Sequence, residues 1–336
     1  MKKKATISRR EIASAAGVSP STVSRALAGS PLIPEATKRK IERIAKRFGY
    51  VPSDLARSFY QKKSFRLGLV IPFSMSEGRV RAVPSEYFSK VLYGAVGAAK
   101  AARYSVTVIT DDGLSARDLE REVLSHAVDG FIFLGGRIGD TRYDELHSRT
   151  VPFVLVHHYV PGKPFISVDT DSESGMRELF AYFREKSVRV LGFLNGGESF
   201  VNAVDRTRLF SSLAEEFGFT VMRSVDGDFS RTSGRNAASH FLGAPFPDAI
   251  VCANDRMAFG LIEAFKRENV AIPADVRVTG FDNQDVSTLL TPALTTIDNP
   301  LYDIGALAAK KLIHRIRGEE VASEQLPSRL IVRESA

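Results

Sequence analysis

Polar side chains that could hold a small molecule come directly after several apolar, strand-sized segments of the chain. His157 and His158 follow one such segment, Asn254 and Asp255 follow another, and Asp282 follows a third. Carboxylate and amide groups accept from and donate to paired hydroxyl groups, so these residue types suit a polyol ligand. Because ligands of doubly wound sheets bind outside the carboxyl ends of the strands, these positions predict one shared binding site.

Cationic side chains near the N-terminus indicate a different chemistry. The first 63 residues contain 15 Lys or Arg and 4 Asp or Glu, a net charge of +11, whereas the other residues contain 31 and 35, a net charge of −4. A basic segment ahead of a mildly acidic body indicates a polyanionic partner for that segment alone. Nucleic acid is the first candidate for this partner, and a membrane surface is the second.

Three short helices are expected to position these cations. Thr6 can cap a first helix, Gly17 supplies a tight turn, and Ser19 followed by Pro20 is a strong start signal for a second helix. Two helices joined by a glycine turn have the layout of a helix-turn-helix, whose second helix enters the major groove of DNA. A third helix, roughly 34–48, is expected to complete the core of this unit.

The rest of the chain alternates short β-rich segments with helix-length segments, which predicts parallel sheets with crossover helices. We expect strands at 67–71, 106–110, 130–134, 153–156, 188–194, 249–253 and 276–281. We expect helices at 88–102, 117–126, 172–185, 205–217 and 257–268. These strands are too many for one small sheet, so the sequence predicts an α/β body of two doubly wound lobes.

Composition and motifs argue against several other classes of protein. A single cysteine, Cys252, excludes an internal disulfide framework and a multi-cysteine metal site. No segment has the features of a signal peptide or a membrane span, so we expect a cytoplasmic, nucleoid-associated protein without membrane contact. The chain has no P-loop, no Gly-x-Gly-x-x-Gly after a strand and no Gly-x-Ser-x-Gly turn, so we expect no enzyme, no cofactor and no bound metal.

Motifs at both ends of the chain carry a family resemblance. The N-terminal segments resemble the start of the lactose-repressor (LacI/GalR) family of bacterial transcription regulators, and the C-terminal segments are similar to that family's later motifs. These segments are 7–13, 16–19, 22–29, 252–260, 278–283 and 290–297. The resemblance covers nearly the whole chain.

The resemblance implies three parts of the chain. They are an all-α helix-turn-helix domain at 1–50, a hinge helix or linker at 51–64, and a periplasmic-binding-protein-like domain for effector binding and dimerisation at 65–336. Its N-lobe would span about 65–164 and 298–325. Its C-lobe would span about 165–297 and 326–336.

The resemblance also implies DNA contacts from the second helix and the hinge. Pro20 and Ser21 stand at base-choosing positions, and Arg25 could grip a guanine through two hydrogen bonds, with a phosphate contact as its alternative role. Phe59 stands where the family inserts a leucine between base pairs, so we interpret it as an apolar wedge or as an aromatic packed on the body. Phosphate contacts, helix caps or hinge contacts are implied for Thr6, Ser19, Thr22, Ser24, Tyr50, Leu55, Ala56 and Arg57.

For the body, the resemblance implies a cleft between the lobes that holds a small effector, commonly a sugar or a nucleobase. The implied polar contacts are Asn254, Asp282 and Arg206, the implied stacking surfaces are Phe229, Tyr87 and Phe88, and Phe73, His157 and Asn202 complete the site. His157 stands where the family often has an aspartate. The loop at 74–85 carries Arg79 and Arg81, which fits either a lid that attracts an acidic sugar or a surface loop.

Several of these residues have a structural alternative. Asn254 and Asp255 could cap the helix that starts near Met257, and for Asp255 this is the preferred interpretation. Arg206 could be a solvated cation on its helix.

The sequence thus predicts a repressor that binds double-stranded DNA as a homodimer or tetramer, on a near-palindromic operator, and responds to a small effector, a sugar or sugar derivative. A nucleobase-responsive corepressor-type regulator is the alternative, and a small-molecule-binding protein without a regulatory role is a weaker one. A periplasmic sugar-binding protein would have no use for the basic segment.

Overall fold

The computed structural model describes residues 7–50, 61, 63–72, 74–76, 79–81, 86–242 and 246–336. The chain forms an N-terminal helical unit and a larger α/β body, each compact by itself. Some residues with predicted DNA or effector contacts lie outside the described residues: Thr6, Leu55, Ala56, Arg57, Phe59 and Phe73.

The N-terminal unit contains the three predicted helices. They are α1 (Arg9–Ala16), α2 (Pro20–Leu27) and α3 (Glu35–Arg47). Ser8 caps α1 in place of the predicted Thr6, because Ser8 and Glu11 exchange hydrogen bonds with each other's backbone amides. Gly17 makes the turn with φ of 69°, and Ser19 caps α2 ahead of Pro20, as predicted.

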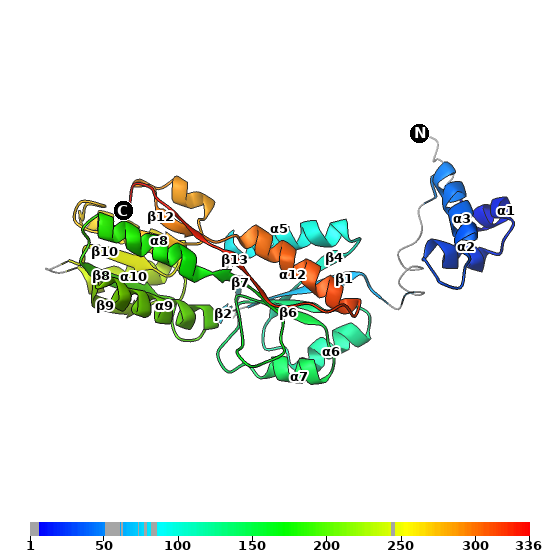
Figure 1. The fold of residues 1–336 in the computed structure, drawn as a ribbon, viewed down its shortest axis with the longest axis horizontal. Coiled ribbons are helices and arrows are strands. Elements are labelled where there is room, and N and C mark those ends of the chain that lie inside the picture. Colours follow the sequence, from blue (N-terminus) through cyan, green and yellow to red (C-terminus); the bar gives the residue numbers. More distant parts are fainter. Residues whose placement is uncertain are drawn as a thin grey trace. The chain divides into compact units, whose positions relative to one another are not determined.

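The body contains two six-stranded sheets (Figure 1). The first sheet has the order β13 (Glu324–Pro327), β7 (Ser167–Asp171), β6 (Phe153–Val156), β5 (Phe131–Leu134), β1 (Arg66–Pro72) and β4 (Ser105–Asp111). The second has the order β14 (Arg329–Ile331), β12 (Thr295–Asp298), β11 (Arg277–Phe281), β10 (Ala249–Cys252), β8 (Val190–Asn195) and β9 (Thr220–Asp226). In the second sheet β14 runs antiparallel to β12, whereas β8 to β12 are mutually parallel.

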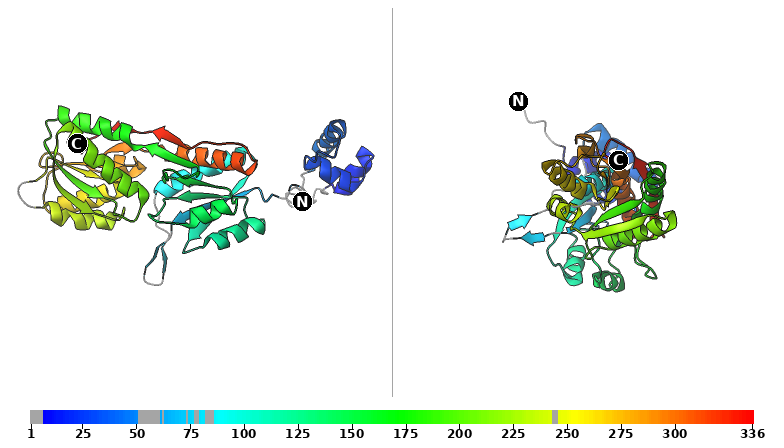
Figure 2. Two further views of the ribbon diagram at one scale, coloured as in Figure 1. Left: turned by 60° about the horizontal axis from the view of Figure 1, so that its bottom comes forward. Right: turned by 90° about the vertical axis from the view of Figure 1, so that its left-hand side faces the viewer.

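Helices cover both faces of each sheet, as Figures 1 and 2 show. The first lobe has α5 (Glu86–Ala101), α6 (Ala116–Leu124), α7 (Arg142–Ser148) and α12 (Leu301–Ile316). The second has α8 (Ser172–Glu185), α9 (Val201–Phe217), α10 (Arg231–Phe241), α11 (Asp255–Arg267) and the 3-10 turn η1 (Asp285–Thr288). The predicted pair of doubly wound lobes is therefore present.

Two features of the body differ from the sequence predictions. The strand β7 pairs with β6 and belongs to the first sheet, so the chain crosses to the second lobe after Asp171 and not near residue 164. The segment expected to be a loop at 74–85 contains two short antiparallel strands, β2 (Ser74–Ser76) and β3 (Arg79–Arg81).

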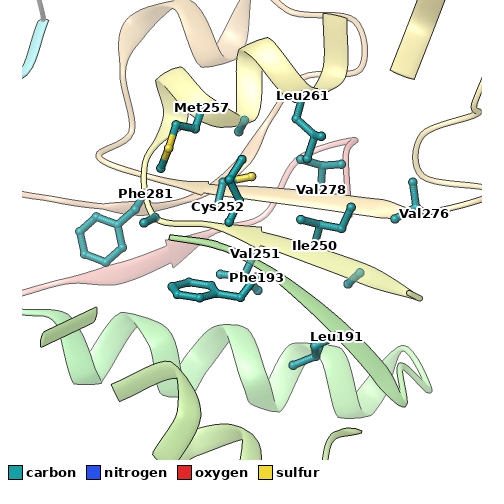
Figure 3. Close-up of a cluster of buried hydrophobic side chains, with 14 of the residues drawn as sticks. Leu191, Phe193, Ile250, Val251, Cys252, Met257, Leu261, Val276, Val278 and Phe281 are labelled. Atoms are coloured by element: carbon teal, nitrogen blue, oxygen red, sulfur yellow. The ribbon is translucent and has the colours of Figure 1, made fainter. Parts of the chain in front are cut away.

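The second lobe has a core of large apolar side chains on both faces of its sheet (Figure 3). Phe193 and Phe281 are fully buried there, as is Cys252, which is a free thiol. Two glycines let α10 and α11 pack in backbone contact. A Cβ on Gly234 would lie 2.1 Å from the Met257 carbonyl oxygen, and a Cβ on Gly260 would lie 2.0 Å from the Arg231 carbonyl oxygen. This close packing fixes the first turns of both helices, which border the site described next.

Candidate functional site

A cavity of about 410 Å³ lies between the two lobes of the body. It is lined by Pro72, Tyr87, Phe88, Gly135, Arg137, Ser199, Phe200, Asn202, Arg206, Asp228, Phe229, Ser230, Asn254, Arg256 and Asp282. The volume is within the usual range for small-molecule sites, and four aromatic rings face the cavity. Seven of the nine predicted effector residues line it, and His157 lies directly behind Tyr87.

A larger hollow of about 710 Å³ shares Arg137, Asn202 and Arg206 with this cavity. Its lining includes many carboxylates and exposed polar residues of the two lobes. We take the smaller cavity as the candidate site, because aromatic surface combined with a few buried polar groups is typical of ligand sites.

Contacts between the lobes besides the cavity include the following among the described residues. The ammonium group of Lys90 lies 3.1 Å from a carboxylate oxygen of Asp285, and the Asp285 amide donates to Glu86 at 2.7 Å. Elsewhere, the Ile138 amide donates to the Ser199 carbonyl oxygen at 3.2 Å. Because the cavity is lined by residues of both lobes, a ligand in it would be held from both sides.

Arg206 is the best-fixed cation of the site. It is 4% exposed, its Nη1 donates to the Ala253 carbonyl oxygen at 2.7 Å, and its guanidinium carbon lies 3.8 Å from the centre of the Phe281 ring. Its Nη2 lies 4.0 Å from the carboxylate of Asp282, and its Nε has no hydrogen-bond partner among the described residues. The solvated alternative for Arg206 is thus wrong, and part of its donor capacity remains for a ligand.

Asp282 also keeps hydrogen-bonding capacity. Its Oδ1 accepts from Asn299 Nδ2 at 3.0 Å, and the residue holds a φ of 112°, a conformation that favours glycine. Burial raises the pKa of Asp282, and the nearby Arg206 cation opposes this shift. A strained backbone at the end of β11 therefore presents a buried carboxylate at the cavity.

Asn254 has the structural role given as its alternative above, whereas Asp255 is buried but does not cap α11 as predicted, because its carboxylate accepts from residues outside that helix. Asn254 Oδ1 accepts from the Met257 amide at 2.9 Å, and its Nδ2 donates to the Phe229 carbonyl oxygen at 3.1 Å. Asp255 is fully buried and accepts from the Thr296 hydroxyl at 2.5 Å and from a backbone amide at 2.7 Å. Asn254 therefore caps α11 and fixes Phe229, so its amide oxygen and nitrogen each already have one partner within the protein.

A directed chain of hydrogen bonds runs behind the cavity. The Tyr87 hydroxyl lies 2.6 Å from His157 Nδ1, and His157 Nε2 lies 3.0 Å from the Thr170 hydroxyl. The Thr170 hydroxyl donates to Asn299 Oδ1 at 2.6 Å, and Asn299 donates to Asp282. Because Thr170 donates its hydroxyl proton to Asn299, His157 Nε2 donates to Thr170, and burial favours the neutral ring, which then accepts from Tyr87 at Nδ1. The chain links a helix and strands of the first lobe to the end of β11 in the second.

We expect His157 to make folding sensitive to acid. Burial, and then the nearby Arg206 cation, lower the pKa of His157 to about 3, against about 6.5 in the unfolded chain. Below pH 6.5 the unfolded state binds the proton first, so the free energy of unfolding falls as pH falls, by about 2 kcal/mol between pH 7 and pH 5 from this group. Urea unfolding at both pH values should show a smaller loss in His157→Gln than in the wild type. His126→Gln is the control, since His126 is exposed and has a similar φ of 58°; an equal loss in wild type and His157→Gln would contradict the assignment.

Two cavity residues absent from the sequence prediction are Arg137 and Arg256. Arg137 follows the end of β5, and Arg256 is the second residue of α11. The strand-end rule covers only polar residues directly after each strand. Including the next two positions would have identified both arginines. Phe200, which lines the cavity just before α9, has no comparable signal.

The exposed face of α2 carries part of the predicted DNA-contacting set. Ser21 and Arg25 are exposed, and Pro20 is partly so. Ser19 is exposed but caps the helix, accepting from the Thr22 amide at 3.1 Å. Within the described residues, the Arg25 side chain has no internal hydrogen bond or ion pair, so it is available to an outside partner.

Two residues with predicted DNA contacts also have contacts within the unit. Ser24 is buried, donates to the Pro20 carbonyl oxygen at 3.3 Å and accepts from Arg9 Nη1 at 3.0 Å, so no free hydroxyl reaches a phosphate. Tyr50 packs against the core of the three helices.

Comparisons with known proteins agree with this organisation. A model of the lacI family of bacterial regulatory proteins matches residues 6–53, and a periplasmic binding protein-like domain matches residues 180–336. Catabolite control protein A of Priestia megaterium is 29% identical over 97% of this chain and 98% of its own length.

Solved structures show the same fold. The transcriptional regulator CelR in complex with cellobiose has a TM-score of 0.72 and 26% identity, over 98% of this chain and 100% of that chain. The lac repressor dimer bound to operator and the anti-inducer ONPF has a TM-score of 0.79 and 22% identity, over 98% of this chain and 99% of that chain.

The helix-turn-helix unit and the two-lobed body with a cavity between its lobes define a ligand-responsive DNA-binding regulator. The chain carries a lacI-family helix-turn-helix domain and a periplasmic binding protein-like domain, and it is similar to regulators of this kind over nearly its whole length. Its relatives are regulators and not enzymes. No helix among the described residues is long and apolar enough to cross a bilayer, and no cluster of three potential metal ligands occurs among them.

Proposed function

We propose that this protein is a repressor whose operator affinity is controlled by a sugar or sugar derivative bound in the cavity between the lobes. The observation that carries the proposal is the buried pair of Arg206 and Asp282, whose unspent donors and acceptors face a cavity with aromatic walls. Carboxylate and guanidinium groups pair with vicinal hydroxyls, and aromatic rings cover the apolar face of a sugar ring. CelR, a similar protein, was solved with cellobiose.

The hydrogen-bonded chain gives a route from ligand to lobe arrangement. A ligand that pairs with Asp282 changes the charge and geometry at one end of the chain, and Tyr87 and His157 lie at the other end, in the other lobe. Coupling of about 1–3 kcal/mol between the cavity and the DNA would suffice for regulation. Induction and corepression both fit this scheme.

Two chains are proposed to pair and to place two helix-turn-helix units on a near-palindromic operator, because a two-fold protein matches a two-fold site. A lac repressor dimer bound to operator has the same fold. Ser21 and Arg25 would contact base edges. Because the proposed partner is chromosomal DNA, the protein would act in the cytoplasm.

The first test is DNA binding by the full chain. An operator selected from a random double-stranded library should bind with a steep dependence on salt, with a log-log slope of about −0.9 per phosphate contacted. Addition of sugars, sugar acids and nucleobases should identify at least one compound that changes operator affinity by about 5–150-fold. A flat salt profile would exclude the DNA-binding function, and an effect confined to nucleobases would favour the alternative effector class.

A further inference from the structure

Two guanidinium groups at the cavity are not used by the protein itself. Arg137 and Arg256 both line it, and within the described residues neither side chain forms a hydrogen bond or an ion pair. Arg137 lies 5.9 Å above the Phe200 ring, a contact that leaves all of its donors free. Arg137 belongs to the first lobe and Arg256 to the second, so one ligand group could be held from both sides.

Arg256 is the more informative of the two because it is partly buried. Burial lowers its pKa, which the Asp228 and Asp282 carboxylates partly oppose. Neither carboxylate is a dedicated partner: Asp228 accepts from the Ser230 amide at 2.9 Å, and Asp282 accepts from Asn299. A guanidinium in such a place is costly unless an anion pairs with it.

The charges of the described residues that line the cavity leave a surplus of positive charge. The cations are Arg137, Arg206 and Arg256, and the anions are Asp228 and Asp282. Arg206 and Asp282 face each other at 4.0 Å and largely offset one another. The first turn of α11, at whose second position Arg256 stands, adds the positive end of a helix dipole.

We propose that the effector is an organic anion, a hydroxylated compound with a carboxylate or phosphate group that pairs with Arg137 and Arg256. This inference rests on the proposed function and names the chemical class of its ligand. The planar guanidinium fork matches both carboxylate and phosphate oxygens, and the charge-assisted hydrogen bonds are stronger than those to a neutral hydroxyl. The hydroxyl groups of the same compound would pair with Asp282 and Arg206, and an anion between the two lobes would hold them together.

The test uses matched ligands that differ at one carbon. The full chain is titrated by calorimetry and thermal shift with glucose, glucuronate and glucose 6-phosphate, and with the corresponding galactose and mannose sets, at constant ionic strength. We expect at least one charged member to bind 10-fold or more tightly than its neutral counterpart. Stronger binding of the carboxylate or of the phosphate member identifies the anionic group.

Arg256→Gln then tests the assigned residue. The substitution breaks no internal hydrogen bond, so the variant is expected to fold, and it should lose at least 10-fold in affinity for the charged ligand and less than 2-fold for its neutral counterpart. Arg267→Gln is the matched control on the same helix, since Arg267 pairs with Glu263 at 3.0 Å, and it should bind like the wild type.

Three outcomes would overturn the inference. They are equal binding of neutral and charged members, an equal loss of both in Arg256→Gln, and tight binding of a neutral sugar or nucleoside without any charged ligand. In these cases the proposed regulatory function would stand. If no compound shifted the melting temperature or changed operator affinity, the effector function itself would fail together with this inference.

Discussion

Arg25→Ala should weaken binding to the selected operator by about 2–6 kcal/mol, or roughly 30-fold to 10⁴-fold, if two chains each lose one bidentate contact to a guanine. The folded state should be unaffected, because Arg25 is exposed and alanine is at least as good a helix former. Binding to random-sequence DNA should fall far less. Fluorescence anisotropy with both DNAs, at several salt concentrations, measures the two losses.

The control for this experiment is Arg47→Ala, which removes the same charge from the exposed end of α3. It should lower operator and random-sequence affinity by similar factors. If Arg25→Ala did the same, and only reduced the salt slope, Arg25 would be a phosphate contact and not a base contact.

Arg206→Lys should lower affinity for the effector by at least 30-fold, whether the effector is charged or neutral. Lysine keeps a positive charge beside Asp282 but loses the planar fork, the stacking on Phe281 and the hydrogen bond to Ala253. Two lost charge-assisted hydrogen bonds to the ligand would cost about 1.5–3 kcal/mol each, which is more than the roughly 2 kcal/mol of a 30-fold loss in affinity. Calorimetry with the compound that gives the largest thermal shift provides the measurement.

Arg208→Lys is a close control, because Arg208 stands one half-turn along the same helix with its side chain 76% exposed. It should keep the wild-type affinity for the effector and for the operator. A melting curve of Arg206→Lys shows whether the variant is folded. A folded variant with unchanged effector affinity would remove Arg206 from the site.

Local signals were enough to predict the N-terminal unit and most of the buried strands. Ser19-Pro20 and Gly17 fix helix boundaries through contacts within a few residues, and central strands such as β10 are continuous apolar segments because both faces are covered. Of the four edge strands of the two six-stranded sheets, β4 was predicted, whereas β9, β13 and β14 were not. Every residue of β9 is exposed or only partly buried, so β9 lacks an apolar strand pattern. The strand β13 is short and largely polar, and it forms through its pairing with β7.

Seven of the nine predicted effector residues lie together around the cavity, but their roles could not be assigned from the sequence. Asn254 and Asp282 are both polar residues after buried strands, yet Asn254 is occupied as a helix cap and Asp282 keeps a free acceptor. Ser24 and Ser21 are likewise three residues apart on one helix, and one is buried while the other is exposed. Such differences depend on which neighbours each side chain meets.

The sequence by itself determined the division into a basic helical unit and an acidic two-lobed body, the capping of α2, and the rule that ligand contacts follow strand ends. The tertiary structure decided which of these contacts remain free. Tyr87 and His157 are 70 residues apart, and Thr170 and Asn299 are 129 apart, yet they share one hydrogen-bonded chain. Arg256 has no such partner among the described residues. Hydrogen bonds in this site join distant segments, so only the folded chain shows which polar groups are paired and which keep free donors or acceptors.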